Sequence, residues 1–336
     1  MRDIPAETVA VQQSHRRLLG ELFAGRAAQC VPSVARIAQC EYLDATPDRF
    51  AAWLDTSIEA LDAGLPQASD TVTFRPLVVE FWPLGVHFVD ALFGARVYEK
   101  DGNFWSDDLP SSLGDLAPPD VGASPLVRWT FDSIGQAIAA LPHAVSVTTP
   151  VFSSPLNIAV NLFGEQALLD LSRPGKRELR GMEAIADAIE SLHRLARDRF
   201  PASRCRFYAS SHRYAPDGFG HICGCTTQLL GPETYARYVA PLDERILRTY
   251  PHGGTIHLCG HHTQHIPRWR KMPCLRGVQL NDAAADDFPA YLAGLRDDQI
   301  IYITPTPRMP LQTILALSGG RRIVLQTKLD RRIPVR

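Results

Sequence analysis

The sequence lacks the segments that would tie the protein to a membrane or divide it into parts. No stretch approaches the roughly 18 to 20 uninterrupted apolar residues that a membrane span needs. Residues 1–17 contain no apolar core of a secretory signal. The 336 residues show no internal repeat, no low-complexity tract and no interdomain linker. We therefore expect one globular, cytoplasmic domain without a membrane partner.

An excess of charge of either sign is also missing. Lysine and arginine together number 35, against 36 aspartates and glutamates. This balance gives no reason to expect a polyanionic partner, so nucleic acid binding is not predicted. A hydrophobic content of 45% is sufficient for a large core.

Cysteine is too sparse for a disulfide-stabilised fold. The chain has seven cysteines, an odd number without the density of a disulfide scaffold, so we expect seven reduced thiols. Cys30, Cys40 and Cys205 lie in or beside apolar runs and are interpreted as small core residues.

The segment 253–260, Gly-Gly-Thr-Ile-His-Leu-Cys-Gly, is the most informative part of the sequence. His257 and Cys259 are two residues apart at the end of a β-branched run, so both side chains would point to the same face of a strand. An imidazole and a thiolate in this arrangement can bind one soft cation such as zinc. Three more histidines follow within six residues, at positions 261, 262 and 265.

Alternation of short β-rich runs with helical patterns predicts a (β/α)8 barrel. Amphipathic helices are expected at 48–64 and 182–200, a helical lead-in at 1–28, and the barrel over 29–336. The connection 99–125 is expected to be a lid or an irregular excursion. The eight expected strands are 31–38, 71–80, 144–151, 204–210, 253–259, 275–281, 299–304 and 322–327.

A barrel of this kind carries its chemistry at the carboxyl ends of the strands. Cys274 precedes a strand and is therefore expected on the opposite, stabilising face. The loop 211–225 contains a second His-x-Cys, His221-Ile-Cys-Gly-Cys225. Its cysteines can be read as zinc ligands or as ordinary partly buried thiols. The polar residues expected at the carboxyl ends are His257, Cys259, Glu80, Trp82, Ser153, Ser154, the loop 211–225, Asn281 and Asp282.

Four segments, in the same order along the chain, resemble the uroporphyrinogen decarboxylase-like superfamily. Residues 253–263, GGTIHLCGHHT, are similar to the zinc-binding strand and loop of methylcobamide:coenzyme M methyltransferases. Further similarity lies in FGARVYEKDGNFW (93–105), SSPLNIAVNLFGEQALLDL (153–171) and LLGPETYARYVAPLDERIL (229–247). The resemblance implies a barrel fold and a zinc site at His257 and Cys259.

The resemblance leaves the third zinc ligand open. These methyltransferases complete zinc with a cysteine near the C-terminus, but residues 302–317 contain none. Cys225, Cys223 or Asp282 would have to replace it. Asp282 has a second interpretation as a helix N-cap. Without that cysteine, a structural zinc site of four protein ligands is not expected, whereas a catalytic zinc needs three and an open position.

The activity implied is transfer of a methyl group between a corrinoid, carried by a small partner protein, and a thiol acceptor. Glu80, Trp82, Ser154, Tyr214 and His221 would bind the small-molecule substrate. Two alternatives stay open: a metal-free, decarboxylase-like enzyme and a binding protein that has lost catalysis. A true uroporphyrinogen decarboxylase is disfavoured, because the first strand offers only one guanidinium, Arg36, for a substrate with many carboxylates.

Overall fold

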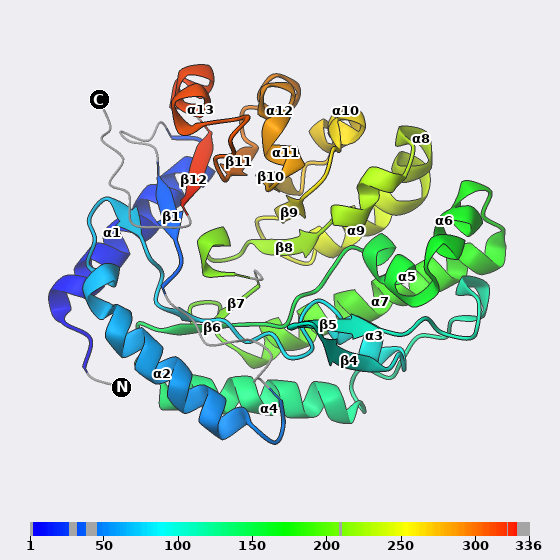
Figure 1. Ribbon diagram of the computed structural model, residues 1–336, viewed down its shortest axis with the longest axis horizontal. Helices are drawn as coiled ribbons and strands as arrows, with labels where there is room; N and C mark the ends of the chain where they lie inside the picture. The colour runs from blue at the N-terminus through cyan, green and yellow to red at the C-terminus, as the bar shows by residue number, and fades with distance from the viewer. Residues whose placement is uncertain (1–2, 27–31, 38–45, 208–209, 321, 328–336) are drawn as a thin grey trace.

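The computed structural model describes residues 3–26, 32–37, 46–207, 210–320 and 322–327, with strands at the centre and helices around them (Figure 1). Seven parallel strands form one sheet in the order β2-β1-β12-β11-β10-β9-β8. Because neighbouring strands are all parallel, their carboxyl ends lie on the same side. Their bounds are β1 Ser33–Ala35, β2 Thr73–Phe74, β8 Gly220–Cys223, β9 Gly254–Leu258, β10 Leu275–Leu280, β11 Ile300–Ile303 and β12 Ile323–Thr327.

A second parallel sheet continues the ring of strands. It has the order β3-β6-β7, with β3 Val78–Val79, β6 Ser146–Thr148 and β7 Cys205–Arg206. Beyond β6, Ser153 forms a parallel bridge with Cys223 of β8, and the chain joins β2 to β3 directly. The two sheets thus follow each other round a (β/α) barrel, which confirms the predicted fold class.

Helices connect the strands and lie outside them. In Figure 1, α13, α12, α10 and α9 follow one another along the outside of β12 to β8. The predicted helices at 48–64 and 182–200 correspond to α2 and α7. No described helix is long and apolar enough to cross a membrane. The bounds are α2 Phe50–Ala68, α3 Phe88–Leu92, α4 Pro125–Ala140, α5 Pro155–Phe163, α6 Glu165–Ser172, α7 Lys176–Arg199, α8 Pro232–Thr234, α9 Ala240–Leu247, α10 Ile266–Arg270, α11 Ala283–Asp286, α12 Phe288–Gly294 and α13 Leu311–Ser318.

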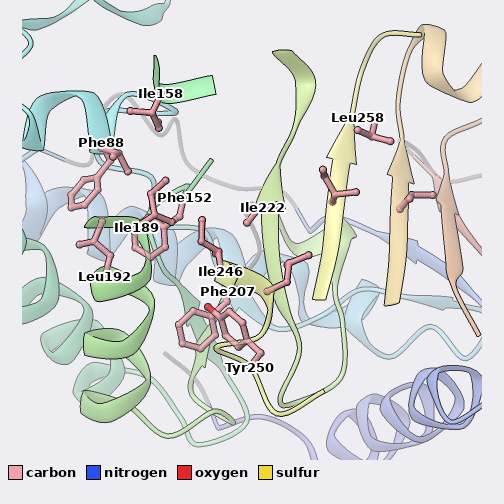
Figure 2. Packing of buried hydrophobic residues seen from close by; sticks show 14 of the residues in the cluster. Phe88, Phe152, Ile158, Ile189, Leu192, Phe207, Ile222, Ile246, Tyr250 and Leu258 are labelled. Carbon is pink, nitrogen blue, oxygen red and sulfur yellow. The ribbon is translucent and has the colours of Figure 1, made fainter. Parts of the chain in front are cut away.

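Strand residues alternate between the barrel interior and an apolar layer under the helices. Ile256 and Leu258 of β9 belong to this apolar layer, whereas Thr255 and His257 between them make polar contacts with the neighbouring strands. Figure 2 shows part of the layer, with Ile222 of β8, Ile246 of α9, and Ile189 and Leu192 of α7. The alternation therefore places the polar residues of β9 on the face that points into the barrel.

Helix α1 (Ala6–Phe23) covers the amino ends of the strands, as the predicted helical lead-in requires. Its Leu19, Leu22 and Phe23 share a separate apolar cluster with inward-facing strand residues such as Val34 and Tyr302. The guanidinium of Arg276, near the start of β10, donates to the carbonyl oxygen of Phe23 at 2.9 Å. This end of the barrel is therefore filled by packing, and the opposite end is left for the candidate site.

The structure corrects three details of the predicted elements. Residues 220–223, expected to lie in a loop, form β8. The predicted strand 71–80 is divided into β2 and β3 at Arg75-Pro76-Leu77, because Pro76 has no amide hydrogen for a sheet. The segment 99–125 contributes to an antiparallel hairpin of β4 (Val97–Lys100) and β5 (Asn103–Ser106). Cys30 and Cys40 lie outside the described residues.

Candidate metal centre

Four side chains of the types that bind metals, Cys223, Cys225, His257 and Cys259, meet at the carboxyl ends of β8 and β9. Cys223, the last residue of β8, is paired in the parallel register with His257 of β9. Cys225 follows β8 after a single glycine, and Cys259 follows β9 directly. The two sequence-predicted motifs, one on each strand, thus face the same point in space.

Gly224 allows this close approach. Its amide donates to the carbonyl oxygen of His257 at 2.9 Å. A Cβ atom at position 224 would lie 2.5 Å from the Cδ1 atom of Ile256. A larger residue would have to displace the Ile256 side chain, so glycine lets the turn lie directly against β9.

The donor atoms are close enough for one metal ion. Donor atoms of Cys223, Cys225 and His257 all lie within 4.8 Å of one another. The Sγ atom of Cys225 is 3.5 Å from that of Cys223 and 3.3 Å from that of Cys259. The Sγ atom of Cys259 is 3.0 Å from Nε2 of His257.

These separations suit a tetrahedral zinc ion. Zinc–sulfur bonds of about 2.3 Å place neighbouring sulfurs about 3.8 Å apart. The Cys225 sulfur would have to move about half an ångström away from its two neighbours. Cys259 lies outside the mutual group of Cys223, Cys225 and His257 and would have to move towards it. Three thiolates and one imidazole are also the soft and borderline donors that zinc prefers over calcium or magnesium. The donor set therefore fits zinc.

The thiols share protons with one another. A hydrogen bond from Cys225 and the positive charge of Arg213 lower the pKa of Cys223 to about 7, against the opposing effect of burial. The pKa of Cys259 is lowered by the same Cys225 donor. The pKa of Cys225 is raised, because it lies between the other two sulfurs. Cys225 has a single S–H hydrogen and can donate to only one of them at a time, so one thiolate is stabilised before any metal binds.

His257 is held as a neutral imidazole. Burial and the nearby Arg213 guanidinium place the pKa of His257 well below its usual value of 6.5. Its Nδ1 atom is hydrogen-bonded to Oε1 of Gln279 on β10. A neutral imidazole with one nitrogen engaged in this way offers its other nitrogen to a metal.

Arg213 brings a positive charge to the thiol cluster. A terminal nitrogen of its guanidinium lies 3.5 Å from Nε2 of His257. Burial lowers the pKa of Arg213. The negative charges of the nearby thiolates act in the opposite direction and raise it; they belong to Cys223, Cys225 and Cys259. The guanidinium would offset the net negative charge of one Zn²⁺ bound to three thiolates.

The three histidines after Cys259 lie apart from the donor group. His262 and His265 are fully buried and brace the 3-10 helix Cys225–Leu229 through Thr227, at 3.1 and 2.8 Å. His261 is paired with Asp287 at 2.7 Å. His262 and His265 therefore support the segment that begins at Cys225 and are not proposed as metal ligands.

Asp282, a predicted ligand, lies at the start of α11 and is exposed. Its carboxylate accepts a hydrogen bond from Asn281 and caps no helix amide. The structure does not place it in the mutual group of Cys223, Cys225 and His257. Asp282 is nevertheless near enough to raise the pKa of Cys259 by its charge.

Glu80 and Trp82 lie where the sequence pattern predicts, at the carboxyl end of β3. Glu80 is buried, and Arg36 donates to it at 3.2 Å while also lying over the Trp82 ring at 5.8 Å. The Ser210 hydroxyl and the Ser211 amide donate to the same carboxylate at 3.0 and 2.6 Å. Glu80 therefore anchors the loop that carries Arg213.

Ser154 and Tyr214, two predicted substrate-binding residues, are used in packing. Ser154 is fully buried, and its hydroxyl donates to Asp243 at 2.7 Å. Tyr214 is 1% exposed and packs on Phe74 in the cluster that α1 covers. Neither side chain is on an accessible surface, so the substrate would have to be bound by other residues.

His221 lies inside the barrel, two residues before Cys223. Its Nδ1 atom is 2.9 Å from the Thr255 hydroxyl, and in the described chain Nε2 has no hydrogen-bond partner. Sequence reasoning assigned His221 to the substrate and gave Cys223 only as an alternative ligand. It missed Arg213 and Gln279, because nothing in their local sequence indicates what lies beside them in space.

Comparison with known proteins identifies a similar fold but does not assign the chain to a family. No family model matches the sequence, and neither does any curated protein. The structure is similar to that of a methyltransferase from Methanosarcina mazei, with a TM-score of 0.61, 11% identity, and coverage of 93% of this chain and 91% of that one. A mandelate racemase/muconate lactonizing-type protein from Labrenzia alexandrii matches at a TM-score of 0.37 and 12% identity, over 92% of this chain and 57% of that one, too weakly to support an argument. The first likeness shows that the chain has the fold of that methyltransferase.

Proposed function

We propose that this protein is a zinc-dependent methyltransferase that moves a methyl group from a corrinoid to a small thiol. The observation that supports this most is the convergence of three sulfurs and one imidazole at the carboxyl ends of β8 and β9. The fold shared with a methyltransferase adds to it.

Cys223, Cys225, His257 and Cys259 would hold the metal. Bound zinc would lower the pKa of a substrate thiol and stabilise its thiolate at neutral pH. The chain's own residues prepare the site: His257 is neutral, two thiols have lowered pKa values, and Arg213 supplies a compensating charge.

A substrate thiol needs an open position, whereas the donor set contains four protein groups. Cys259 is the least enclosed of the three thiols. We propose that the substrate sulfur replaces Cys259 in the active complex, leaving Cys223, Cys225 and His257 as the three permanent ligands.

Spectroscopy of the cobalt-substituted protein tests this exchange. Adding a small thiol to the Co²⁺-loaded protein should change its visible spectrum. In the Cys259→Ser variant, the thiol should bind more tightly, because no protein sulfur competes for the position. Unchanged spectra with a broad panel of thiols would reject the exchange.

A reaction assay tests the activity itself. Zinc-loaded protein, methylcobalamin and a reactive thiol should produce the thioether, with loss of the methylcobalamin spectrum. The Cys225→Ser variant should not support this reaction. The absence of reaction with every thiol, although zinc is bound, would contradict the methyltransferase proposal.

A second candidate is a purely structural zinc centre. The four-donor set favours it, because structural sites are closed by four protein ligands. In that case, cobalt spectra would not respond to thiols, and removal of the metal would unfold the barrel at β8.

A further inference from the structure

A row of buried polar side chains connects the candidate metal centre to the far side of the barrel. His257 of β9 is paired in register with Gln279 of β10. Gln279 and Gln326 of β12 are each 2% exposed, and the Nε2 atom of Gln279 is 2.6 Å from Oε1 of Gln326. Gln326 in turn reaches the backbone carbonyl of His212 at 2.8 Å.

The far end of this row fixes the direction of every hydrogen bond in it. A backbone carbonyl can only accept, so Gln326 must donate to His212 through its amide nitrogen. Its Oε1 atom then accepts from Gln279, a role that the Thr304 hydroxyl supports at 3.3 Å. The amide nitrogen of Gln279 therefore donates to Gln326, and its amide oxygen faces His257.

An oxygen facing Nδ1 of His257 requires a hydrogen on that nitrogen. In a neutral imidazole, Nε2 then carries the lone pair. Arg213, which has donors only, lies 3.5 Å from Nε2 and is compatible with the same tautomer. The Cys259 thiol, whose sulfur is 3.0 Å away, can donate its hydrogen to this lone pair.

We propose that Gln279 and Gln326 are positioning residues that hold His257 in the Nδ1-protonated tautomer, with Nε2 ready to bind zinc. The role of this tautomer in zinc binding rests on the proposed metal centre. The tautomer itself is a property of the metal-free protein and can be tested separately. Neither glutamine is expected to touch the metal.

Nitrogen-15 NMR of the histidine side chains in the metal-free protein tests the proposal. Wild type should show His257 protonated on Nδ1. Gln326→Leu alters none of the side chains that contact His257, although it removes a hydrogen bond to His212 beside Arg213, and it leaves the Gln279 amide free to turn. A fraction of His257 should then be protonated on Nε2. A wild-type protein protonated on Nε2, or a Gln326→Leu variant with the wild-type tautomer, would overturn the proposal.

A rescue experiment separates positioning from packing. A carboxylate at position 279 can only accept, whatever Gln326 does. Gln279→Glu, alone or combined with Gln326→Leu, should therefore restore the Nδ1-protonated form, whereas Gln279→Leu should not. Failure of the carboxylate to restore this tautomer would also reject the proposal.

Zinc titration gives a second readout. Loss of a partner behind a metal-binding histidine typically weakens the affinity about 10- to 100-fold. We expect this range for Gln279→Leu and a smaller loss for Gln326→Leu. Gln299→Leu is the matched control, because Gln299 is buried at the start of β11 and binds the carbonyls of Trp269 and Leu275, each at 3.0 Å. It should lose stability without changing the tautomer.

The two proposals can fail independently. If wild-type protein shows the expected tautomer and the expected response to Gln326→Leu but binds no zinc, the positioning proposal stands and the metal centre does not. If zinc binds and His257 keeps its tautomer in every glutamine variant, the metal centre stands and the positioning proposal fails.

Discussion

Cys225 is the central residue of the thiol cluster, because its sulfur contacts those of both Cys223 and Cys259. The strands alone do not determine this position. It depends on the turn at Gly224, whose amide is held against β9 by the carbonyl oxygen of His257.

Replacing Cys225 by serine should weaken zinc binding by on the order of 100-fold, because about a quarter of a typical total binding free energy of 10–16 kcal/mol would be lost. Competition titration with a chromophoric chelator under reducing conditions measures this. Cys274→Ser is the control, since Cys274 precedes β10 and contacts the Glu244 carbonyl at 3.5 Å. Cys259→Ser should lie between them. Equal affinities of Cys225→Ser and Cys274→Ser would contradict the ligand assignment.

Zinc affinity should decrease as the pH falls below about 7. The pKa of Cys223 is lowered to about 7, so below this pH protons compete with the metal for its sulfur. His257 does not add to this competition, because its pKa is far lower. We expect at least about a tenfold loss per pH unit. An affinity that is constant between pH 7 and 5 would show that thiolates are not the ligands.

At the residue scale, the sequence indicates all four donors as candidates, but it provides a geometric reason for only two of them. The two-residue spacing of His257 and Cys259 on a β-branched run is enough to place both on one face. Cys223 and Cys225 have the same spacing, but β8 is short, begins at Gly220 and ends at Cys223, just before Gly224. Gln279 and Arg213 approach His257 only through the register of β10 and the fold of the 210–213 loop.

At the element scale, the pairing of β8 with β9 creates the site. β8 escapes sequence analysis because His221 and Cys223, its inward-facing residues, are polar, and the strand has only four residues. Hydrophobic periodicity predicts elements that bury an apolar face. A strand that contributes a polar inner face to a functional site lacks this signal.

The polar contact between the β6–α5 segment and α9 can be tested by mutation. Ser154 and Tyr235 both donate to the fully buried Asp243, at 2.7 and 2.9 Å. Ser154→Ala leaves one carboxylate oxygen without this donor and should reduce the free energy of unfolding by about 1–3 kcal/mol. Urea denaturation measures the loss. Ser111→Ala, at an exposed position, is the control and should have little effect. Equal losses of stability in the two variants would show that the Ser154–Asp243 hydrogen bond does not stabilise the fold.

At the scale of the whole molecule, the alternation of strands and helices predicts the barrel correctly. Hydrophobic patterning is repeated in every unit, so an error in one strand, such as 71–80, leaves the fold class unchanged. The site has no such redundancy. It depends on which strands are neighbours, and on four side chains from two of them.

The protein should be less stable in acid. Burial lowers the pKa values of His193 and His262 to about 3. Both must be protonated on unfolding below pH 6.5, so their contribution is complete above this pH and is lost as the pH falls towards 3. At pH 5 the loss should be about 2 kcal/mol for each histidine.

Asp243 acts in the opposite direction. Burial raises its pKa to about 7, so its contribution is complete below about pH 3.8 and is lost as the pH rises through 7. Urea denaturation at pH 5 and 7 should still show the lower stability at pH 5, because six histidines with lowered pKa values oppose two buried aspartates, Asp243 and Asp90. Replacing His193 by glutamine should reduce the difference, and Asp243→Asn should increase it. A wild-type protein that is more stable at pH 5 would contradict this account.

X-ray absorption at the zinc edge of the reconstituted protein tests the central claim most directly. We predict one zinc per chain, with a first shell dominated by sulfur at about 2.3 Å and one nitrogen at about 2.0–2.1 Å. The sulfur contribution should fall by one scatterer in the Cys225→Ser variant. Failure to bind zinc, or a first shell made only of oxygen and nitrogen, would show that Cys223, Cys225, His257 and Cys259 do not form a metal centre.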